Sequence, residues 1–211
     1  MNRIINHRLL TTIVALLAAL PMAVGASAAL TAQQVAQKAA AVIAGAKGLS
    51  AGFVATGSGV TSKGTINGSG TKFSVITPQV SIWYNGKSLY TYNPRTSETT
   101  ITTPDAQELL ESNPLLYVKG GVSGYTCTYS ATRQKGKYVV DLTPRNKRSG
   151  IKKMTFTVNA SDFHINKIVV VGSGGTTTVN VTSFKTGVAF PASVFEYPKA
   201  RYPKAEIIDL R

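Results

Sequence analysis

The feature that most constrains this fold is a long series of short segments in which apolar and polar residues alternate. Gly, Ser, Asn and Pro separate the segments at the spacing that is typical of antiparallel strands. The separators are mostly short enough for hairpins, so consecutive strands are expected to be neighbours. We predict eleven strands, which are Leu49–Thr56, Val60–Asn67, Thr71–Thr77, Val80–Asn85, Lys87–Asn93, Ser97–Thr103, Tyr125–Arg133, Lys137–Thr143, Ile151–Asn159, Phe163–Gly172 and Thr176–Ser183.

A sheet with this many strands is expected to curl, because the twist between neighbouring strands accumulates across it. The predicted fold class is therefore mainly β, an incomplete antiparallel β-barrel of about eleven strands with a helical lid. Only two helical segments are available to cover its concave side. We therefore expect an interior that side chains do not completely fill.

The first helical segment is expected from Leu30 to Ala46. Thr31 and Gln34 have the spacing of a capping box, in which each side chain bonds the backbone of the other residue. An alanine-rich stripe should pack closely against the sheet. Its members are Leu30, Val35, Ala39, Val42 and Ala46.

The second helical segment is short and lies between two predicted strands. Thr103 is a plausible N-cap, Pro104 suits the first helical position, and Asn113 precedes the proline that should end the helix. A small amphipathic helix at this point could lie across the sheet as a lid. The expected apolar contacts of the lid are Leu109, Leu110, Leu115 and Leu116.

A hairpin at Asn85-Gly86 defines the two faces of the sheet. A two-residue type I′ turn there pairs Tyr84 with Lys87. Alternation then predicts one face with Val80, Ile82 and Leu89, and an opposite face with Trp83, Tyr90 and Tyr92. We expect the C-terminal tail, with Phe190, Phe195 and Tyr197, to cover that opposite face.

The apolar positions that alternate along several strands are the candidates for a cavity lining. Each of them could instead be packed core, and the sequence leaves both interpretations open. The candidates are Leu49, Ala51, Phe53, Phe73, Val75, Val80, Ile82, Leu89, Met154 and Phe156.

The N-terminal segment is typical of a signal peptide. Arg3 and Arg8 precede an apolar run from Leu9 to Val24, and an A-x-A cleavage signal ends at Ala28. The run is shorter than the roughly 20 residues that span a bilayer. We expect residues 1–28 to be removed and residues 29–211 to form a single soluble, exported domain.

The charge of the chain is strongly positive, with 23 basic and 9 acidic residues and a formal net charge of +14. The first acidic residue is Glu98, and three more lie on the predicted lid. A basic body of this kind favours anionic partners such as lipid head groups or acidic protein surfaces. Export makes nucleic acid the least favoured partner, and we predict none.

Candidate catalytic groups are few. His164 has no acidic residue beside it in the sequence, and Cys127 is the single cysteine, at an alternating strand position where a small buried side chain fits. The Asn85–Ser88 segment resembles the end of a phosphate-binding loop but lacks the first glycine and a following helix. We therefore predict no enzymatic activity, no metal and no cofactor.

Three segments in order resemble LolA-type periplasmic carriers of outer-membrane lipoproteins, specifically the branch found in Bacteroidota. They are KFSVITP, WYNGKSLYTYNP and TPDAQELLESNPLLYV, within residues 72–118. The resemblance is good over Leu49 to Val118 and weaker over Tyr125 to Ser183. Proteobacterial members carry an arginine that is important for function at a position that aligns here with Asn67.

The resemblance implies a cavity that holds the acyl chains of a lipoprotein in transit. It also implies a monomer that receives lipoproteins from an inner-membrane ABC-type release complex and delivers them to the outer membrane, where an acceptor is possible. Two other functions remain open from the residues. One is a carrier of another lipid or glycolipid, and the other is a non-catalytic β-rich envelope interaction module with a filled core.

Overall fold

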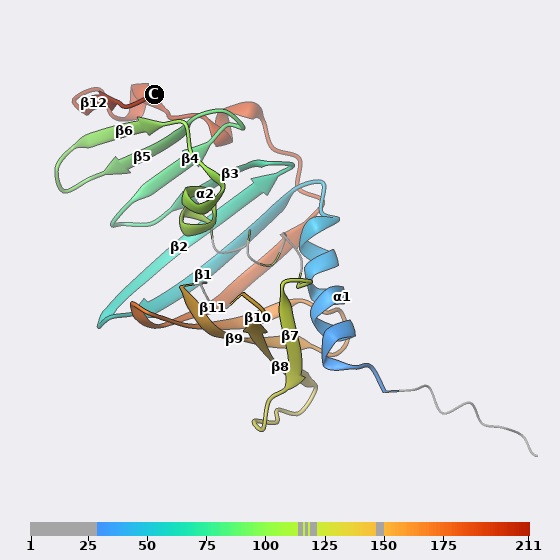
Figure 1. Cartoon of the computed structure of the whole chain (residues 1–211). Coiled ribbons are helices and arrows are strands. Elements are labelled where there is room, and N and C mark those ends of the chain that lie inside the picture. The colour runs from blue at the N-terminus through green and yellow to red at the C-terminus, as the bar shows by residue number, and fades with distance from the viewer. Residues whose placement is uncertain (1–28, 114–115, 117, 119–121, 147–149) are drawn as a thin grey trace, which may run out of the picture.

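A single curled sheet of twelve strands dominates the computed structural model (Figure 1). The structure describes residues 29–113, 116, 118, 122–146 and 150–211, with only the backbone at 107, 110 and 111. The elements are α1 (Ala32–Ala44), β1 (Leu49–Gly57), β2 (Val60–Ser69), β3 (Lys72–Ile76), β4 (Ser81–Tyr84), β5 (Leu89–Asn93), β6 (Glu98–Thr102), α2 (Ala106–Ser112), β7 (Tyr125–Tyr129), β8 (Lys137–Pro144), β9 (Ile151–Asn159), β10 (Ile165–Gly172), β11 (Gly175–Thr186), two 3-10 turns η1 (Ala192–Phe195) and η2 (Lys199–Arg201), and β12 (Glu206–Asp209).

The order of the strands shows that the barrel is incomplete. The sheet runs β12-β6-β5-β4-β3-β2-β1-β11-β10-β9-β8-β7, so β1 pairs with β11 and joins the two halves of the chain. The sheet is open between its two edge strands, β12 and β7, and α2 lies in the connection from β6 to β7. All eleven predicted strands are present. The tail adds the twelfth, β12, which pairs in parallel with β6.

The hairpin between β4 and β5 keeps the predicted faces but not the predicted pairing. Tyr84 pairs with Leu89 instead of Lys87, a slip of two residues in the register. The side-chain oxygen of Asn85 accepts bonds from the N–H groups of Lys87 and Ser88, and only Gly86 in this turn has a positive φ, at 95°. The type I′ turn is therefore wrong, because it needs positive φ at Asn85 as well. A slip of two residues returns every side chain to its original face.

Helix α1 begins as predicted, with the reciprocal Thr31–Gln34 capping box. Its buried stripe includes Ile43 in place of the predicted Val42. The cap of α2 differs from the prediction, because Asp105 and not Thr103 accepts the bond from the Glu108 N–H, at 2.8 Å. The helix therefore begins after Pro104, at Ala106.

Two apolar clusters occupy the concave side of the sheet. The larger cluster packs α1 against β7 to β10, and its fully buried members include Val35, Leu142 and Phe156. The smaller cluster lies on β1 to β5 and includes Phe73 and Leu89. Helix α1 thus covers one half of the concave surface and leaves the other half to the lid region (Figure 1).

The convex face of β3 to β5 is covered by the C-terminal tail, as predicted. Phe195 is buried, and the Tyr197 ring stacks on Tyr90 with ring centroids 6.0 Å apart. The Asn85 amide donates to Glu196 at 3.0 Å, which attaches the tail to the β4–β5 turn. The apolar groups on this face therefore belong to the folded core, and the concave face is the one left for a site.

Candidate functional site

The predicted cavity residues gather on the concave face. Leu49, Met154 and Phe156 belong to the larger cluster, whereas Ala51, Phe73, Val75 and Leu89 form part of the smaller one. Phe53 and Ile82 are half-buried and pack against the smaller cluster. Val80 lies in the β3–β4 turn, outside both clusters among the described residues, where its N–H donates to the Thr77 hydroxyl at 3.0 Å. Their role as ligand contacts remains a prediction.

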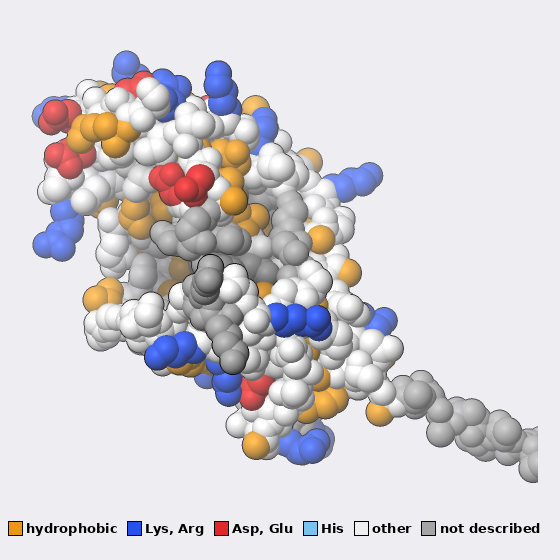
Figure 2. Space-filling model, in the orientation of Figure 1, with side chains coloured by type: hydrophobic (Ala, Val, Ile, Leu, Met, Phe, Trp, Pro, Cys, Tyr) orange, Lys and Arg blue, Asp and Glu red, His pale blue; other side chains and the backbone are white. Residues whose placement is uncertain are grey.

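The concave face is not completely filled on the side of the smaller cluster. Phe53, Ile82, Val181 and Phe184 are large apolar side chains that point to this face, yet each stays only partly buried. In the space-filling view the molecule is hollowed between the two halves of the sheet, and hydrophobic side chains are visible inside the hollow (Figure 2). Apolar surface that strands turn inward without covering it can bind an apolar ligand.

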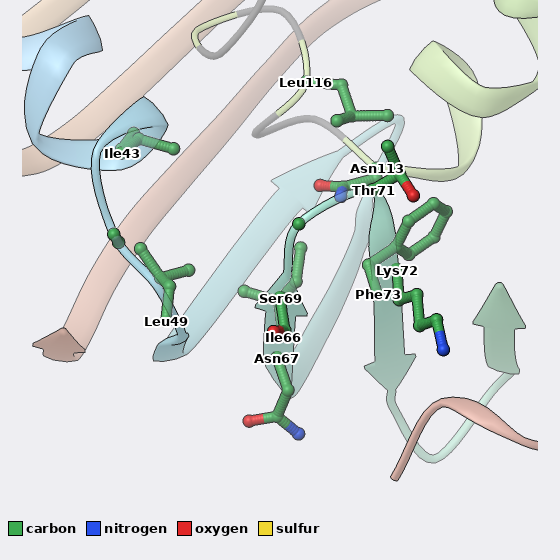
Figure 3. Close-up of a pocket in the computed structure, with 13 residues that line it drawn as sticks. Ile43, Leu49, Ile66, Asn67, Ser69, Thr71, Lys72, Phe73, Asn113 and Leu116 are labelled. Atoms are coloured by element: carbon green, nitrogen blue, oxygen red, sulfur yellow. The ribbon is translucent and has the colours of Figure 1, made fainter. Parts of the chain in front are cut away.

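A small cavity of about 40 Å³ lies where the two clusters meet. Ile43 at the end of α1 and Leu49 of β1 face Phe73 of β3 across it, with Leu116 above them (Figure 3). Residues 68–71, which are the end of β2 and the β2–β3 turn, also line it. Sequence reasoning missed Ile43 and that turn, and the alternation along β2 could have found Ile66, a further lining residue. We call this space the seam cavity.

The lid contacts the same surface. Leu109 of α2 and Leu116 after it pack against the smaller cluster, together with Ile82. The Thr102 hydroxyl of β6 donates to the Glu108 carboxylate at 3.0 Å, which ties α2 to the end of β6. The other two predicted lid contacts, the side chain of Leu110 and the whole of Leu115, lie outside the described residues.

Asn67 points away from the lid. Its side-chain oxygen accepts from the Ser50 hydroxyl at 2.8 Å, and its amide donates to Ser74 at 3.4 Å. Ser74 pairs with Trp83 on the convex face, so Asn67 bonds on the face opposite the seam cavity. Among the described residues, the Asn67 side chain therefore makes no hydrogen bond to the lid.

Titratable groups do not form a cluster at the seam cavity, where Lys72 is the one such residue among the described lining. His164 Nδ1 lies 3.4 Å from Asp162 in the β9–β10 turn, where the backbone N–H of His164 lowers the pKa of the Asp162 carboxyl. Burial raises the pKa of the Cys127 thiol, which keeps it protonated and poorly nucleophilic. The described residues contain no group of three possible metal ligands and no helix long and apolar enough to cross a membrane.

Comparison with known proteins identifies the family. Residues 22–172, well over half of the chain, match the family model described as outer membrane lipoprotein carrier protein LolA. No curated protein matches the sequence.

Among solved structures, an uncharacterized conserved protein from Thermus thermophilus matches with a TM-score of 0.56 at 12% identity, over 83% of this chain and 98% of that one. A LolA superfamily protein from Nitrosomonas europaea matches with a TM-score of 0.41 at 13% identity, over 80% and 99% of the two chains. LprF from Mycobacterium bovis matches with a TM-score of 0.43 at 12% identity, over 76% and 95%. The first shows the shared fold, and the family match shows that this chain belongs to the LolA family of outer membrane lipoprotein carrier proteins.

Proposed function

We propose that this protein is a periplasmic chaperone that shields the acyl chains of lipoproteins and carries them from the inner to the outer membrane. The observation that carries the proposal is the partly covered concave face, where Phe53 and Ile82 share an apolar cluster with the lid residues Leu109 and Leu116. The family match supports a role as a carrier rather than as an enzyme.

The structure corresponds to the closed form in this proposal. A seam cavity of about 40 Å³ is far smaller than the roughly 300–1,000 Å³ of typical ligand pockets. An acyl chain therefore needs the space that the lid occupies. When the lid moves away, the chain replaces Leu109 and Leu116 against the half-buried side chains of the sheet.

The energetic argument favours such an exchange. Each methylene taken out of water contributes about 0.8 kcal/mol, so free lipoprotein acyl chains cannot cross an aqueous compartment unprotected. The lid supplies two described leucine contacts and one hydrogen bond to β6. Acyl chains can replace these contacts with a larger apolar area. Without cargo, the same contacts are enough to close the lid over the sheet.

The proposal includes several further predictions from the sequence. Cleavage after Ala28 releases the chain into the periplasm, and an inner-membrane ABC-type release complex supplies the cargo. A monomer without cofactor is sufficient for this role. Membership of the Bacteroidota branch, and an outer-membrane acceptor, also remain proposals.

The test compares two lysine variants expressed in the native envelope. Ile82→Lys places a charge on the concave face, whereas Thr65→Lys places the same charge at an exposed position of the convex face. Mass spectrometry of co-purified material should find lipoproteins with the wild type and Thr65→Lys, and at least about tenfold less with Ile82→Lys. Equal cargo on both variants would contradict the proposed site.

The second candidate is a carrier of another lipid or glycolipid, and the uncovered apolar face supports it equally. The same mass spectrometry distinguishes the two, because a free lipid without polypeptide would identify this alternative. A filled β-rich interaction module predicts no bound lipid at all.

A further inference from the structure

A second, larger cavity lies at the other end of α1. It has a volume of about 360 Å³, within the roughly 300–1,000 Å³ of small-molecule pockets. Its lining residues come from the chain that leads into α1 and from the β7–β8 hairpin. We call it the hairpin groove, and its lining residues are Ala29, Leu30, Tyr129, Ser130, Thr132, Arg133, Gln134, Lys137, Tyr138 and Val139.

The hairpin groove is separate from the seam cavity. Ile43 and Ala46 line the seam cavity at the end of α1, whereas Leu30 lines the groove just before its start. Thirteen helical residues between them span about 20 Å at 1.5 Å per residue. No described residue lines both spaces.

Aromatic rings give the groove an apolar wall. Tyr129 and Tyr138 lie with ring centroids 6.3 Å apart, and Tyr138 stacks on Phe163 with planes at 8°. The Tyr129 hydroxyl donates to the Leu30 carbonyl at 2.5 Å, which joins the two walls. Burial raises the pKa of Tyr129, so the phenol remains protonated and keeps this bond at neutral pH.

Two cations line the groove, and none of its described lining residues is a carboxylate that would neutralise them. The Lys137 ammonium donates to the side-chain oxygens of Asn159 and Asn166, which are neutral amides. Arg133 is exposed and makes no ion pair among the described residues. Asp162 lies near enough for the Lys137 charge to help lower its pKa, but it is not a lining residue.

We infer that the hairpin groove binds an anionic phospholipid, with its phosphate on Arg133 and the first part of its chains against Tyr129 and Tyr138. A guanidinium group is a usual protein partner of phosphate oxygens, and the tyrosine wall suits the apolar part of the same molecule. The Lys137 ammonium is bonded to Asn159 and Asn166 outside the groove lining and contributes only its charge. If the chain is cleaved after Ala28, the new ammonium group of Ala29 adds a further positive charge to the groove.

The test titrates the processed protein, beginning at Ala29, with soluble dihexanoyl phosphatidylglycerol at low salt, and follows backbone amide shifts by NMR. Shifts should concentrate at Tyr129, Arg133 and Tyr138. Arg133→Gln should weaken binding about tenfold, because it removes a charge-assisted bond. Lys135→Gln removes an equal charge from the same hairpin outside the lining and should change the affinity less than about twofold.

Three outcomes would overturn the inference. They are equal binding by Arg133→Gln and Lys135→Gln, shifts confined to the seam cavity, or inorganic phosphate binding as tightly as the lipid, which would leave a simple anion site. Ile82→Lys should bind phosphatidylglycerol like the wild type. The proposed carrier function and the proposed phospholipid site can therefore be disproved independently of each other.

Discussion

The Trp83 indole lies edge-on against the Tyr197 ring, with ring centroids 5.7 Å apart and planes at 70°. Trp83 comes from β4 and Tyr197 from the tail more than a hundred residues later, and Trp83 is only 4% exposed. The tail therefore completes the core on the convex face, where the sheet alone would leave aromatic side chains in water.

Removing the Tyr197 ring should destabilise the whole domain. We expect Tyr197→Ala to lower the free energy of unfolding by about 2–3 kcal/mol, below the range for a fully buried aromatic side chain because the Tyr197 ring is half-buried. Tyr197→Phe is the matched control and should lie within about 0.5 kcal/mol of the wild type, because the buried hydroxyl has no partner among the described residues. Urea denaturation measures both. A large loss in Tyr197→Phe would mean that the hydroxyl is bonded.

A close backbone contact at Gly48 should exclude any side chain. A Cβ added there would lie 1.9 Å from the Val188 carbonyl oxygen, where the tail leaves the sheet. Gly48→Ala should lower the free energy of unfolding by about 1–3 kcal/mol or more, as overpacked positions do. Gly68→Ala, whose Cβ meets nothing nearer than 3.9 Å, should cost less than about 1 kcal/mol. Thermal unfolding of both variants checks this difference.

The cap of α2 should control how often the lid helix opens. Asp105→Ala removes a capping bond worth about 1 kcal/mol, which corresponds to roughly fivefold faster hydrogen exchange at the Asn113 amide. Asp105→Asn keeps a side-chain acceptor and should exchange at nearly the wild-type rate. Unchanged exchange in Asp105→Ala would show that tertiary contacts, and not the cap, hold α2.

The carboxyl of Asp209, near the C-terminus, should have a lowered pKa. Hydrogen bonds from the Arg211 side chain and backbone lower the Asp209 pKa from 3.8 to about 2. Because the folded pKa is below the ordinary value, the stabilisation is complete above about pH 4 and disappears as the pH falls through about 2. An NMR titration of the Asp209 carboxyl should therefore have its midpoint near 2. In Arg211→Ala the midpoint should return toward 3.8, and a midpoint that does not move would assign the shift to another group.

The strand pattern and the division of faces were predictable because both depend on local alternation. The predicted β4–β5 register was wrong by two residues, yet Ile82 and Trp83 still lie on the predicted faces, since alternation depends only on even and odd positions. The Asn85 side chain decided the turn by binding two N–H groups, a choice that an Asn-Gly pair does not specify.

Long-range pairings could not be predicted from the sequence. Strand β12 is short, and its residues Ile207 and Ile208 give no alternation that would specify a parallel partner more than a hundred residues away. The seam cavity depends on how the end of α1 meets the β2–β3 turn, so Ile43 had no local signal of its role. The Asp105 cap lies two residues from the predicted Thr103, and both residue types cap helices well.

The opening between the edge strands β12 and β7 has a mechanical consequence. The central β1–β11 ladder holds the two halves of the sheet together, while in the described part of the chain no ladder joins the two rims, β12 and β7. The rims can spread apart by flexing the sheet, without giving up any interstrand bond. If the protein carries acyl chains as proposed, the stiffness of the sheet, more than the shape of a rigid pocket, would set the range of ligand sizes that the concave face can accommodate.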